Sequence, residues 1–558
     1  MMVKSSLIKN LHQAYQSLKI SQATQIPIDE IQSWTQEALF KEEKYSDKSS
    51  IETEKFTKIN ELASPASPLN ISPVLIVGAG IAGLTVAWRL QQAGVPIEIV
   101  EATKRIGGRI RTVPEAAGTY LIGELGSEFI DSDHTCLQAL IKELGLELTD
   151  LSNTDQDLIP TTFYFNGQPV SFKTIIHELT PIVAQIEKDL KSLANFRNYT
   201  TPHPIASALD QLSLREYLER IPASDWIRKL IEITYTLEFG REAQEQSCLN
   251  LLYLIGIEKE NLSLLGKCDE RFCVAGGNEQ IIAKLGDYLA SSIKIETALE
   301  SIRCLSDNRY KVSFRRGEGV IERVYERIVL TVPFSVLRHL ELKVDLPSAK
   351  RSAIDRLGYG TNTKLIVGYR DKIWKNKYNH TGNILTDLPF QNIWENVQSK
   401  AHLQEGLLTN FTGGYQGLKL GEATPHFQSQ KLNQQLEAIF PGIDEVSIPS
   451  QALRSNWIED CYQRGSYACY LVGQWTQIYG VEKERIGNLF FAGEHCSEDY
   501  QACMEGGCET AEVVALQILN DLNLYAFAQQ QKLRLKNNLI AKGLKSRLLP
   551  FQRSKLDV

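Results

Sequence analysis

The chain has 558 residues, 43% of them hydrophobic, which is enough to fill two or more cores of an ordinary globular enzyme. Its formal net charge of −7 argues against nucleic acid as a partner. No apolar run is long enough to span a bilayer, and residues 1–11 lack the apolar core of a signal peptide, so we expect a cytoplasmic protein.

The first part of the chain looks like an appendage to the main body. Apolar residues recur at helical spacing between Leu7 and Leu18, and a second short helix is expected after Pro27. The stretch 63–68, Ala-Ser-Pro-Ala-Ser-Pro, is typical of a linker. We therefore expect a helical appendage and linker over residues 1–70.

A glycine-rich turn follows the first strongly apolar run of the main body, residues 73–77. Gly78 permits a tight turn, Gly80 lets the backbone approach a pyrophosphate, and Gly83 lets the following helix pack closely on the strand. The diphosphate would lie at the N-terminus of this helix, where free N–H groups favour anions. Glu101 ends a second apolar run and can accept hydrogen bonds from ribose hydroxyls. The pattern predicts a bound dinucleotide.

Two more glycines after the acidic residue indicate which dinucleotide is bound. The run 105–109, Arg-Ile-Gly-Gly-Arg, allows a second close backbone approach, and Arg109 can neutralise a phosphate through two hydrogen bonds. This arrangement resembles the glutathione-reductase-like class of FAD proteins. The resemblance implies an α/β fold with an FAD-binding Rossmann domain.

The FAD-binding domain is predicted to be split into three blocks, residues 71–130, 271–334 and 456–525. The intervening segments, 131–270 and 335–455, are expected to form an α+β substrate domain. The runs expected to form strands are 95–100, 293–296, 310–314, 327–332, 363–369 and 489–492.

The third block carries the most specific pattern. The run 488–495, Asn-Leu-Phe-Phe-Ala-Gly-Glu-His, is followed by 504–511, Met-Glu-Gly-Gly-Cys-Glu-Thr-Ala. With the glycine fingerprint, these runs resemble the motifs of the flavin amine oxidase superfamily, which includes monoamine oxidases, polyamine oxidases and L-amino-acid oxidases. Three further segments agree with the resemblance: Val274-Ala275-Gly276-Gly277-Asn278, Val332-Pro333 and Arg464-Gly465-Ser466-Tyr467.

The resemblance implies an FAD-dependent amine oxidase. Such an enzyme transfers a hydride equivalent from the α carbon of an amine to flavin N5, the imine hydrolyses, and O₂ reoxidises the flavin to give H₂O₂. A strand ending at Gly493 would place the Glu494 carboxylate at the ribityl hydroxyls. A helix starting near Met504 would direct its N–H groups at the flavin edge that gains negative charge on reduction.

Other residues take their expected roles from the same resemblance. Lys364, four residues after Gly360, matches a lysine that holds a water against flavin N5 and aids reoxidation by O₂. A solvated lysine on a strand with one exposed face would give the same local pattern. Tyr467 matches one wall of an aromatic cage beside the flavin. Trp457 and Trp475 either line the same region or belong to the core.

Two positions near the flavin depart from the amine oxidase pattern. The second wall of the cage is usually aromatic, and Cys503 stands there, so the cage is incomplete unless Tyr500 compensates. Ser466 occupies the position at which monoamine oxidases carry the cysteine that links to flavin. We therefore expect non-covalent FAD.

The substrate side depends on the segment 123–130, Gly-Glu-Leu-Gly-Ser-Glu-Phe-Ile. In L-amino-acid oxidases this motif usually ends with an arginine that pairs with the substrate carboxylate, and no arginine occurs here. Glu128 could instead attract an amine, or it could be hydrogen-bonded within the protein. Arg241 or Arg454 could still bind a carboxylate.

The leading hypothesis has three rivals. They are an L-amino-acid oxidase or monooxygenase acting on basic or aromatic substrates, a flavin desaturase or porphyrinogen-type oxidase, and a non-catalytic flavoprotein scaffold. The expected partners are a small amine or amino acid and O₂, and a homodimer stays open. The expected catalytic residues are Lys364, Tyr467, Glu128 and Trp457. The expected cofactor-binding residues are Gly78, Gly80, Ile81, Ala82, Gly83, Glu101, Ala102, Gly108, Arg109, Gly126, Ser127, Glu128, Gly493, Glu494, Cys503 and Met504.

The end of the chain, residues 526–558, is a basic tail. Between Lys532 and Val558 the only acidic side chain is Asp557. A basic amphipathic helix of this kind can lie on an anionic membrane surface, or it can dock on the acidic body of the protein. The ten cysteines form no Cys-x-x-Cys pair and the nine histidines are unclustered, so we expect no metal site.

Overall fold

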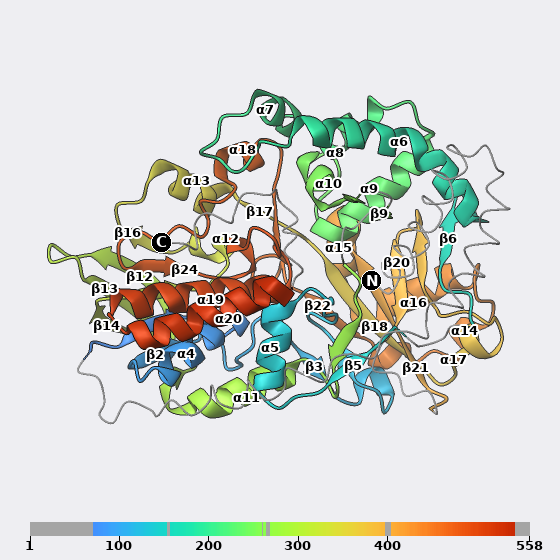
Figure 1. Cartoon of the computed structure of the whole chain (residues 1–558). Coiled ribbons are helices and arrows are strands. Elements are labelled where there is room, and N and C mark those ends of the chain that lie inside the picture. Colours follow the sequence, from blue (N-terminus) through green and yellow to red (C-terminus); the bar gives the residue numbers. More distant parts are fainter. Residues whose placement is uncertain (1–70, 153–156, 259–260, 264–267, 397–402, 542–558) are drawn as a thin grey trace, which may run out of the picture.

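The computed structural model describes residues 71–152, 157–258, 261–263, 268–396 and 403–541, which are coloured in Figure 1. The predicted appendage of residues 1–70 and the last part of the predicted tail, 542–558, lie outside the described residues. Within the described residues, no helix combines the length and the hydropathy needed to cross a membrane.

The first large sheet is parallel, and its five strands follow the order β11-β2-β1-β15-β24. The strands are β1 (Val74–Val77), β2 (Ile97–Val100), β11 (Ile293–Lys294), β15 (Ile328–Leu330) and β24 (Leu489–Phe491). Each falls within a run that was predicted to form a strand. The sheet thus draws on all three sequence blocks assigned to the FAD-binding domain, while the exact domain boundaries stay a prediction.

Both faces of this sheet are covered, because successive side chains of a strand point to opposite sides. Val74 and Ile76 pack in one core with helices α4 (Ile81–Gln92), α11 (Glu279–Leu289) and α19 (Met504–Asp521). Leu75 and Val77 face the other core, which includes an antiparallel sheet of order β14-β13-β12-β16. Its strands are β12 (Ala298–Cys304), β13 (Tyr310–Arg316), β14 (Gly319–Tyr325) and β16 (Glu341–Lys343). Double coverage explains why β1, β15 and β24 are continuous apolar runs.

The second large sheet has seven strands in the order β22-β18-β21-β20-β19-β6-β7, and only the β19–β6 pair is parallel. They are β6 (Thr162–Phe165), β7 (Gln168–Val170), β18 (Thr363–Tyr369), β19 (Ile384–Thr386), β20 (Asn392–Glu395), β21 (Gly406–Thr412) and β22 (Leu453–Asn456). The strand predicted over 363–369 is confirmed as β18. In Figure 1 a group of helices lies above this sheet: α6 (Phe172–Ser192), α7 (Pro204–Asp210), α8 (Leu214–Glu219), α9 (Asp225–Phe239) and α10 (Leu249–Leu254).

Shorter elements connect these bodies. The helices are α5 (Thr135–Glu143), α12 (Phe334–Leu337), α13 (Ser348–Arg356), α14 (Ile373–Asn376), α15 (Gly414–Gly421), α16 (Pro425–Leu436), α17 (Ile443–Val446) and α18 (Gln474–Ile478). The paired strands are β3 (Thr112–Val113) with β4 (Gly123–Glu124), β5 (Leu148–Asp150) with β10 (Phe272–Val274), β8 (Gly256–Glu258) with β9 (Asn261–Ser263), and β17 (Gly358–Tyr359) with β23 (Ala468–Cys469).

The first half of the predicted basic tail is a helix, α20 (Tyr525–Ala541), that packs against α19 and α5. The Arg534 guanidinium lies 3.9 Å from the Glu143 carboxylate, and Gln531 donates to the buried Glu512 side chain. This part of the tail therefore docks on the body of the protein. Membrane contact by the residues beyond it stays a prediction.

Candidate cofactor and active site

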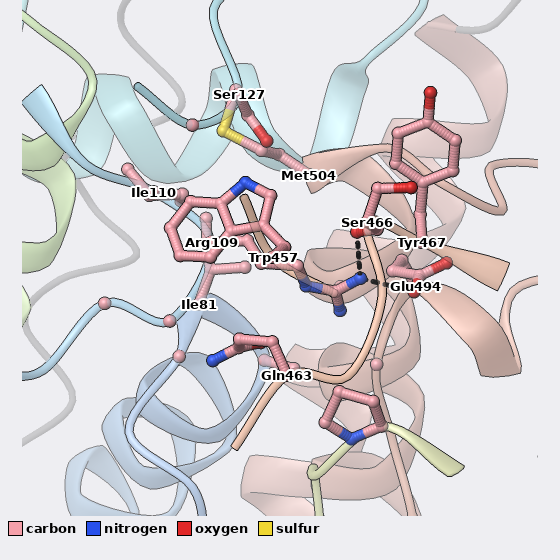
Figure 2. A pocket seen from close by; sticks show the side chains of 18 of the residues that line it. Ile81, Arg109, Ile110, Ser127, Trp457, Gln463, Ser466, Tyr467, Glu494 and Met504 are labelled. Atoms are coloured by element: carbon pink, nitrogen blue, oxygen red, sulfur yellow. Dashed lines mark hydrogen bonds and ion pairs between the residues drawn. The ribbon is translucent and has the colours of Figure 1, made fainter. Parts of the chain in front are cut away.

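A cavity brings together nearly all the residues that the sequence motifs select. Lys364, Tyr467, Glu128 and Trp457 line it, and so does every expected cofactor-binding residue except Gly83. Figure 2 shows side chains around this cavity that come from widely separated parts of the chain, including Ile81, Ser127 and Met504.

The glycine turn forms one end of the cavity, and its geometry fits the three roles that the fingerprint predicts. Gly78 has a φ of +104°, and a Cβ there would lie 2.6 Å from the Thr331 Oγ1 atom. A Cβ on Gly83 would lie 2.0 Å from the backbone oxygen of Gly78, so only glycine lets α4 pack on the turn. A Cβ on Gly80 would meet no atom within 4 Å. Gly80 therefore leaves room for a ligand against the backbone.

The start of α4 opens into the same space. Gly80 precedes the helix and provides no side-chain cap, and Gly80, Ile81 and Ala82 all line the cavity. The first N–H groups of a helix have no partner within the helix, so this end suits an anion. At the end of β2, Glu101 accepts hydrogen bonds from the backbone N–H groups of Ala79, at 3.0 Å, and Thr103, at 2.9 Å. These contacts hold the carboxylate beside the turn.

Arg109 joins two of the sequence blocks across the cavity. Its Nη1 atom donates to the Glu494 carboxylate and to the Ser466 backbone oxygen, both at 2.8 Å, as the dashed lines in Figure 2 show. Glu494 also accepts a hydrogen bond from the Ala502 backbone N–H at 2.9 Å. The carboxylate that follows β24 is thus held between a guanidinium and the loop leading to α19.

A second helix begins at the cavity. Cys503 precedes α19 without a side-chain cap, and Cys503, Met504 and Gly507 line the cavity. A Cβ on Gly507 would lie 3.0 Å from the Ile81 Cγ2 atom, so glycine lets the starts of α19 and α4 come close. Two helix N-termini therefore face one space.

The aromatic candidates separate into two groups. Tyr467 and Trp457 line the cavity, and the Tyr467 hydroxyl donates to the Leu237 backbone oxygen at 3.1 Å. Trp475 lies elsewhere, in a core where its indole N–H donates to Asn250. Tyr500 is also outside the cavity lining, and its hydroxyl donates to Asp133. Of the two tryptophans, only Trp457 lines the cavity and could contribute an aromatic wall. Cys503 stands where an aromatic residue is expected, and Tyr500 does not take that place because it lies outside the lining.

The segment after β4 is fixed by contacts from three directions. A Cβ on Gly126 would lie 2.0 Å from the Arg109 backbone oxygen, so the chain passes very close here. The buried Asn278 side chain donates to the backbone oxygens of Ser127, at 3.0 Å, and Glu128, at 2.9 Å. Lys364 donates to the Gly126 backbone oxygen at 2.9 Å. This gives the 274–278 motif a structural explanation that the sequence did not supply.

The arginines considered as carboxylate partners lie away from the cavity. Arg241 pairs with Glu245 on the neighbouring turn. Arg454 donates to three backbone oxygens around the end of α15, among them that of Leu420. Neither side chain lines the cavity.

Sequence reasoning missed several residues of the cavity wall. Asn362 accepts a hydrogen bond from the Ser466 hydroxyl at 2.7 Å, and its position two residues before Lys364 could have drawn attention to it. Acidic residues from loops and α9 carry no such signal: Asp131, Glu238 and Glu270. His134 also lines the cavity, 3.2 Å from the Asp131 carboxylate. Burial lowers the pKa of His134, yet the surrounding carboxylates, Asp131 first, raise it above its ordinary value.

Residues 81–519 match the sequence model of the family described as flavin containing amine oxidoreductase. The chain belongs to this family. It is 25% identical over 464 residues to amine oxidase [flavin-containing] B of Canis lupus familiaris, covering 80% of this chain and 86% of that protein. It is 24% identical over 467 residues to amine oxidase [flavin-containing] A of Sus scrofa, covering 80% and 85%.

Solved structures of amine oxidases share the fold. A wild-type putrescine oxidase bound to putrescine superposes with a TM-score of 0.68 at 19% identity, covering 80% of this chain and 99% of that one. Cyclohexylamine oxidase from Brevibacterium oxydans IH-35A gives a TM-score of 0.67 at 20% identity, covering 81% and 100%. The predicted architecture, an FAD-binding Rossmann domain with a substrate domain, is confirmed. Family membership makes the protein a flavin-dependent amine oxidoreductase.

Proposed function

We propose that the protein binds FAD non-covalently in this cavity and oxidises a small amine. When bound, FAD would supply the oxidant for removal of a hydride equivalent from the carbon beside the amine nitrogen, with O₂ as the final acceptor and H₂O₂ as its product. The imine product hydrolyses in water. Three features support FAD as the occupant. They are the room beside the backbone at Gly80, the starts of α4 and α19 without a side-chain cap, and the Arg109–Glu494 ion pair.

The charged side chains that line the cavity are the observation that favours an amine as the substrate. Of the described residues that line it, six are carboxylates: Glu101, Glu128, Asp131, Glu238, Glu270 and Glu494. Arg109 and Lys364 are the only lysine or arginine side chains in that lining, and each is paired with a carboxylate, Glu494 and Glu128 respectively. A substrate carboxylate would therefore have no uncommitted arginine or lysine to meet, whereas an amine would enter a negative field. This favours an amine over an amino acid.

Each residue has a role in this proposal. The N-terminus of α4 would hold the diphosphate, and Glu101 would bind ribose hydroxyls. Glu494, oriented by Arg109, would bind the ribityl chain. Tyr467 would present one aromatic face to the amine. Ser466 has no thiol with which to link flavin, and its hydroxyl is used in a hydrogen bond to Asn362.

Anaerobic titration of the purified FAD-loaded protein tests the function. We expect primary amines to bleach the flavin absorbance and the corresponding α-amino acids to leave it unchanged. Peroxide release on admission of air should follow the same order. Bleaching by amino acids alone would favour the L-amino-acid oxidase alternative. Bleaching by neither class would contradict the proposal. Acid precipitation should release all FAD into the supernatant if the cofactor is non-covalent.

A further inference from the structure

Glu128 links the cavity wall to Lys364 through a buried ion pair. The Glu128 side chain is 1% exposed and that of Lys364 is 6% exposed, and both residues line the cavity. The Lys364 ammonium donates to Glu128 Oε2 at 3.0 Å. The Trp394 indole N–H donates to the other carboxylate oxygen, Oε1, at 3.2 Å. Both oxygens of Glu128 are thus bound by side chains from the seven-stranded sheet.

The ammonium of Lys364 is fully committed within the protein. Besides Glu128, it donates to the backbone oxygens of Glu124, at 3.0 Å, and Gly126, at 2.9 Å. A lysine ammonium has three hydrogens, and each has an acceptor here. A water held by Lys364, as the family resemblance implies, would have to share one of these hydrogens. Contacts within the protein thus give Lys364 a well-defined position.

The surroundings of the pair are apolar and aromatic. Trp394 packs against Phe129, with ring centroids 6.2 Å apart, and against Phe411, at 5.9 Å. The Lys364 nitrogen lies 5.6 Å from the Trp394 ring centroid. In such a region charges act over longer distances than in water, because the local dielectric constant is low. The net charge of this wall therefore matters to anything bound beside it.

Glu128 is the carboxylate that balances Lys364. Glu124 is also buried next to the ammonium, but burial raises the pKa of its carboxyl to about 8. Burial therefore disfavours the charged form of Glu124, and Glu128 is the carboxylate that the ammonium contacts directly. The Lys364–Glu128 pair is then neutral as a unit, and replacing either partner changes the charge of the wall by one.

We propose that Glu128 is a positioning residue that, by pairing with Lys364, keeps this part of the cavity wall free of an uncompensated cation and so holds down the reduction potential of the bound FAD. The inference rests on the proposed function, since it requires FAD in this cavity. Reduction of the flavin ring by two electrons and one proton adds one negative charge to it. An uncompensated cation in the wall would stabilise that charge and make the flavin easier to reduce.

Two substitutions that change the charge of the wall in opposite directions test this role. Glu128→Gln keeps the shape of the side chain and leaves Lys364 uncompensated, so the potential of the FAD-loaded protein should rise. Lys364→Met removes the cation and leaves a buried carboxylate, so the potential should fall, and it should fall by less than it rises in Glu128→Gln where that carboxyl takes up a proton. The double variant restores neutrality, and its potential should return close to that of the wild type. Trp394→Phe is the control, because it removes one hydrogen bond of Glu128 but no charge.

The measurements are the midpoint potential, by equilibration with a reference dye, and the dissociation constant of sulfite, an anion that adds to oxidised flavin. For Glu128→Gln we expect sulfite to bind about tenfold more tightly, which for a two-electron couple corresponds to about 30 mV. Shifts of the same sign in both single variants, or no shift in either, would overturn the inference. If Glu128→Gln alone does not retain FAD, the double variant compared with Lys364→Met still decides the sign. Neither readout needs an amine, so an enzyme that no amine reduces would refute the proposed function and leave this inference testable.

Discussion

The two ends of the cavity are built in different ways. At the turn end, a continuous stretch from β1 into α4 makes the site mainly with backbone: three glycines and the first N–H groups of a helix. At the far end, Glu128 and Lys364 make the site with side chains, and Trp394 supports Glu128 from outside the lining. These three residues come from a loop after β4 and from two strands of another sheet. Backbone sites depend on conformation, whereas side-chain sites depend on partners. The turn end should therefore be sensitive to any added atom, and the far end to charge.

The largest effect is expected from an added methyl group at Gly83. Because its Cβ would lie 2.0 Å from the Gly78 backbone oxygen, Gly83→Ala must separate α4 from the turn. We expect a loss of stability of about 3 kcal/mol or more and no bound FAD. Thermal unfolding of the FAD-free protein and the flavin content after purification would measure both.

Gly80→Ala is the matched control for that substitution. The added Cβ meets no protein atom within 4 Å, and the φ of −79° suits alanine. We expect stability within about 1 kcal/mol of the wild type and a weaker affinity for FAD. If Gly80→Ala bound FAD normally, the backbone of the turn would not be in contact with the cofactor.

The next effect in size concerns Arg109, which pairs with Glu494 in the cavity wall. Arg109→Gln removes a charge-assisted hydrogen bond to Glu494 and should weaken FAD binding by about 1.5–3 kcal/mol, or roughly tenfold to a hundredfold. Quenching of flavin fluorescence would give the dissociation constant. Arg111→Gln, two residues away and exposed, should bind FAD like the wild type. Equal losses in both variants would indicate a general effect of positive charge instead of a specific contact.

The contrast between a backbone-built end and a side-chain-built end also explains which features could be predicted from the sequence. The five strands of the parallel sheet and the start of α19 at Met504 were predicted because apolar runs and glycines act locally. The exclusion of Trp475 from the cavity could not be predicted, because aromatic residues look alike in a core and in a site. The alternatives left open for Glu128 could not be resolved either, because its partner Trp394 lies 266 residues away and no motif marks it.

A smaller effect, confined to one pH range, is expected from Glu124 at the far end. Its carboxyl is buried, and desolvation raises its pKa from 4.5 to about 8 in the folded protein. Between these two values the folded state holds a proton that the unfolded state has released, so this group makes stability fall as pH rises. Glu124→Gln should remove a slope of at most about 1.4 kcal/mol per pH unit across that window.

Unfolding of the FAD-free protein at several pH values between 4.5 and 8 would measure the difference between variant and wild type. Glu318→Gln, at the exposed tip between β13 and β14, serves as a control that should leave the slope unchanged. Parallel pH profiles for Glu124→Gln and the wild type would mean that Glu124 is ionised at neutral pH. In that case Glu128 would share the balancing of Lys364 with a second carboxylate.

The smallest effect is expected from Ser455, which anchors the segment before Glu128. Its hydroxyl donates to the Leu125 backbone oxygen at 2.6 Å, and the side chain is buried. Ser455→Ala should cost about 1 kcal/mol of stability, because a buried carbonyl loses its partner. Ser313→Ala, whose hydroxyl has only a 3.4 Å contact on an exposed strand, should cost less. If Ser455→Ala also shifts the flavin potential, the position of Lys364 depends on this anchor. If only stability changes, the ion pair with Glu128 is sufficient to hold the ammonium in place.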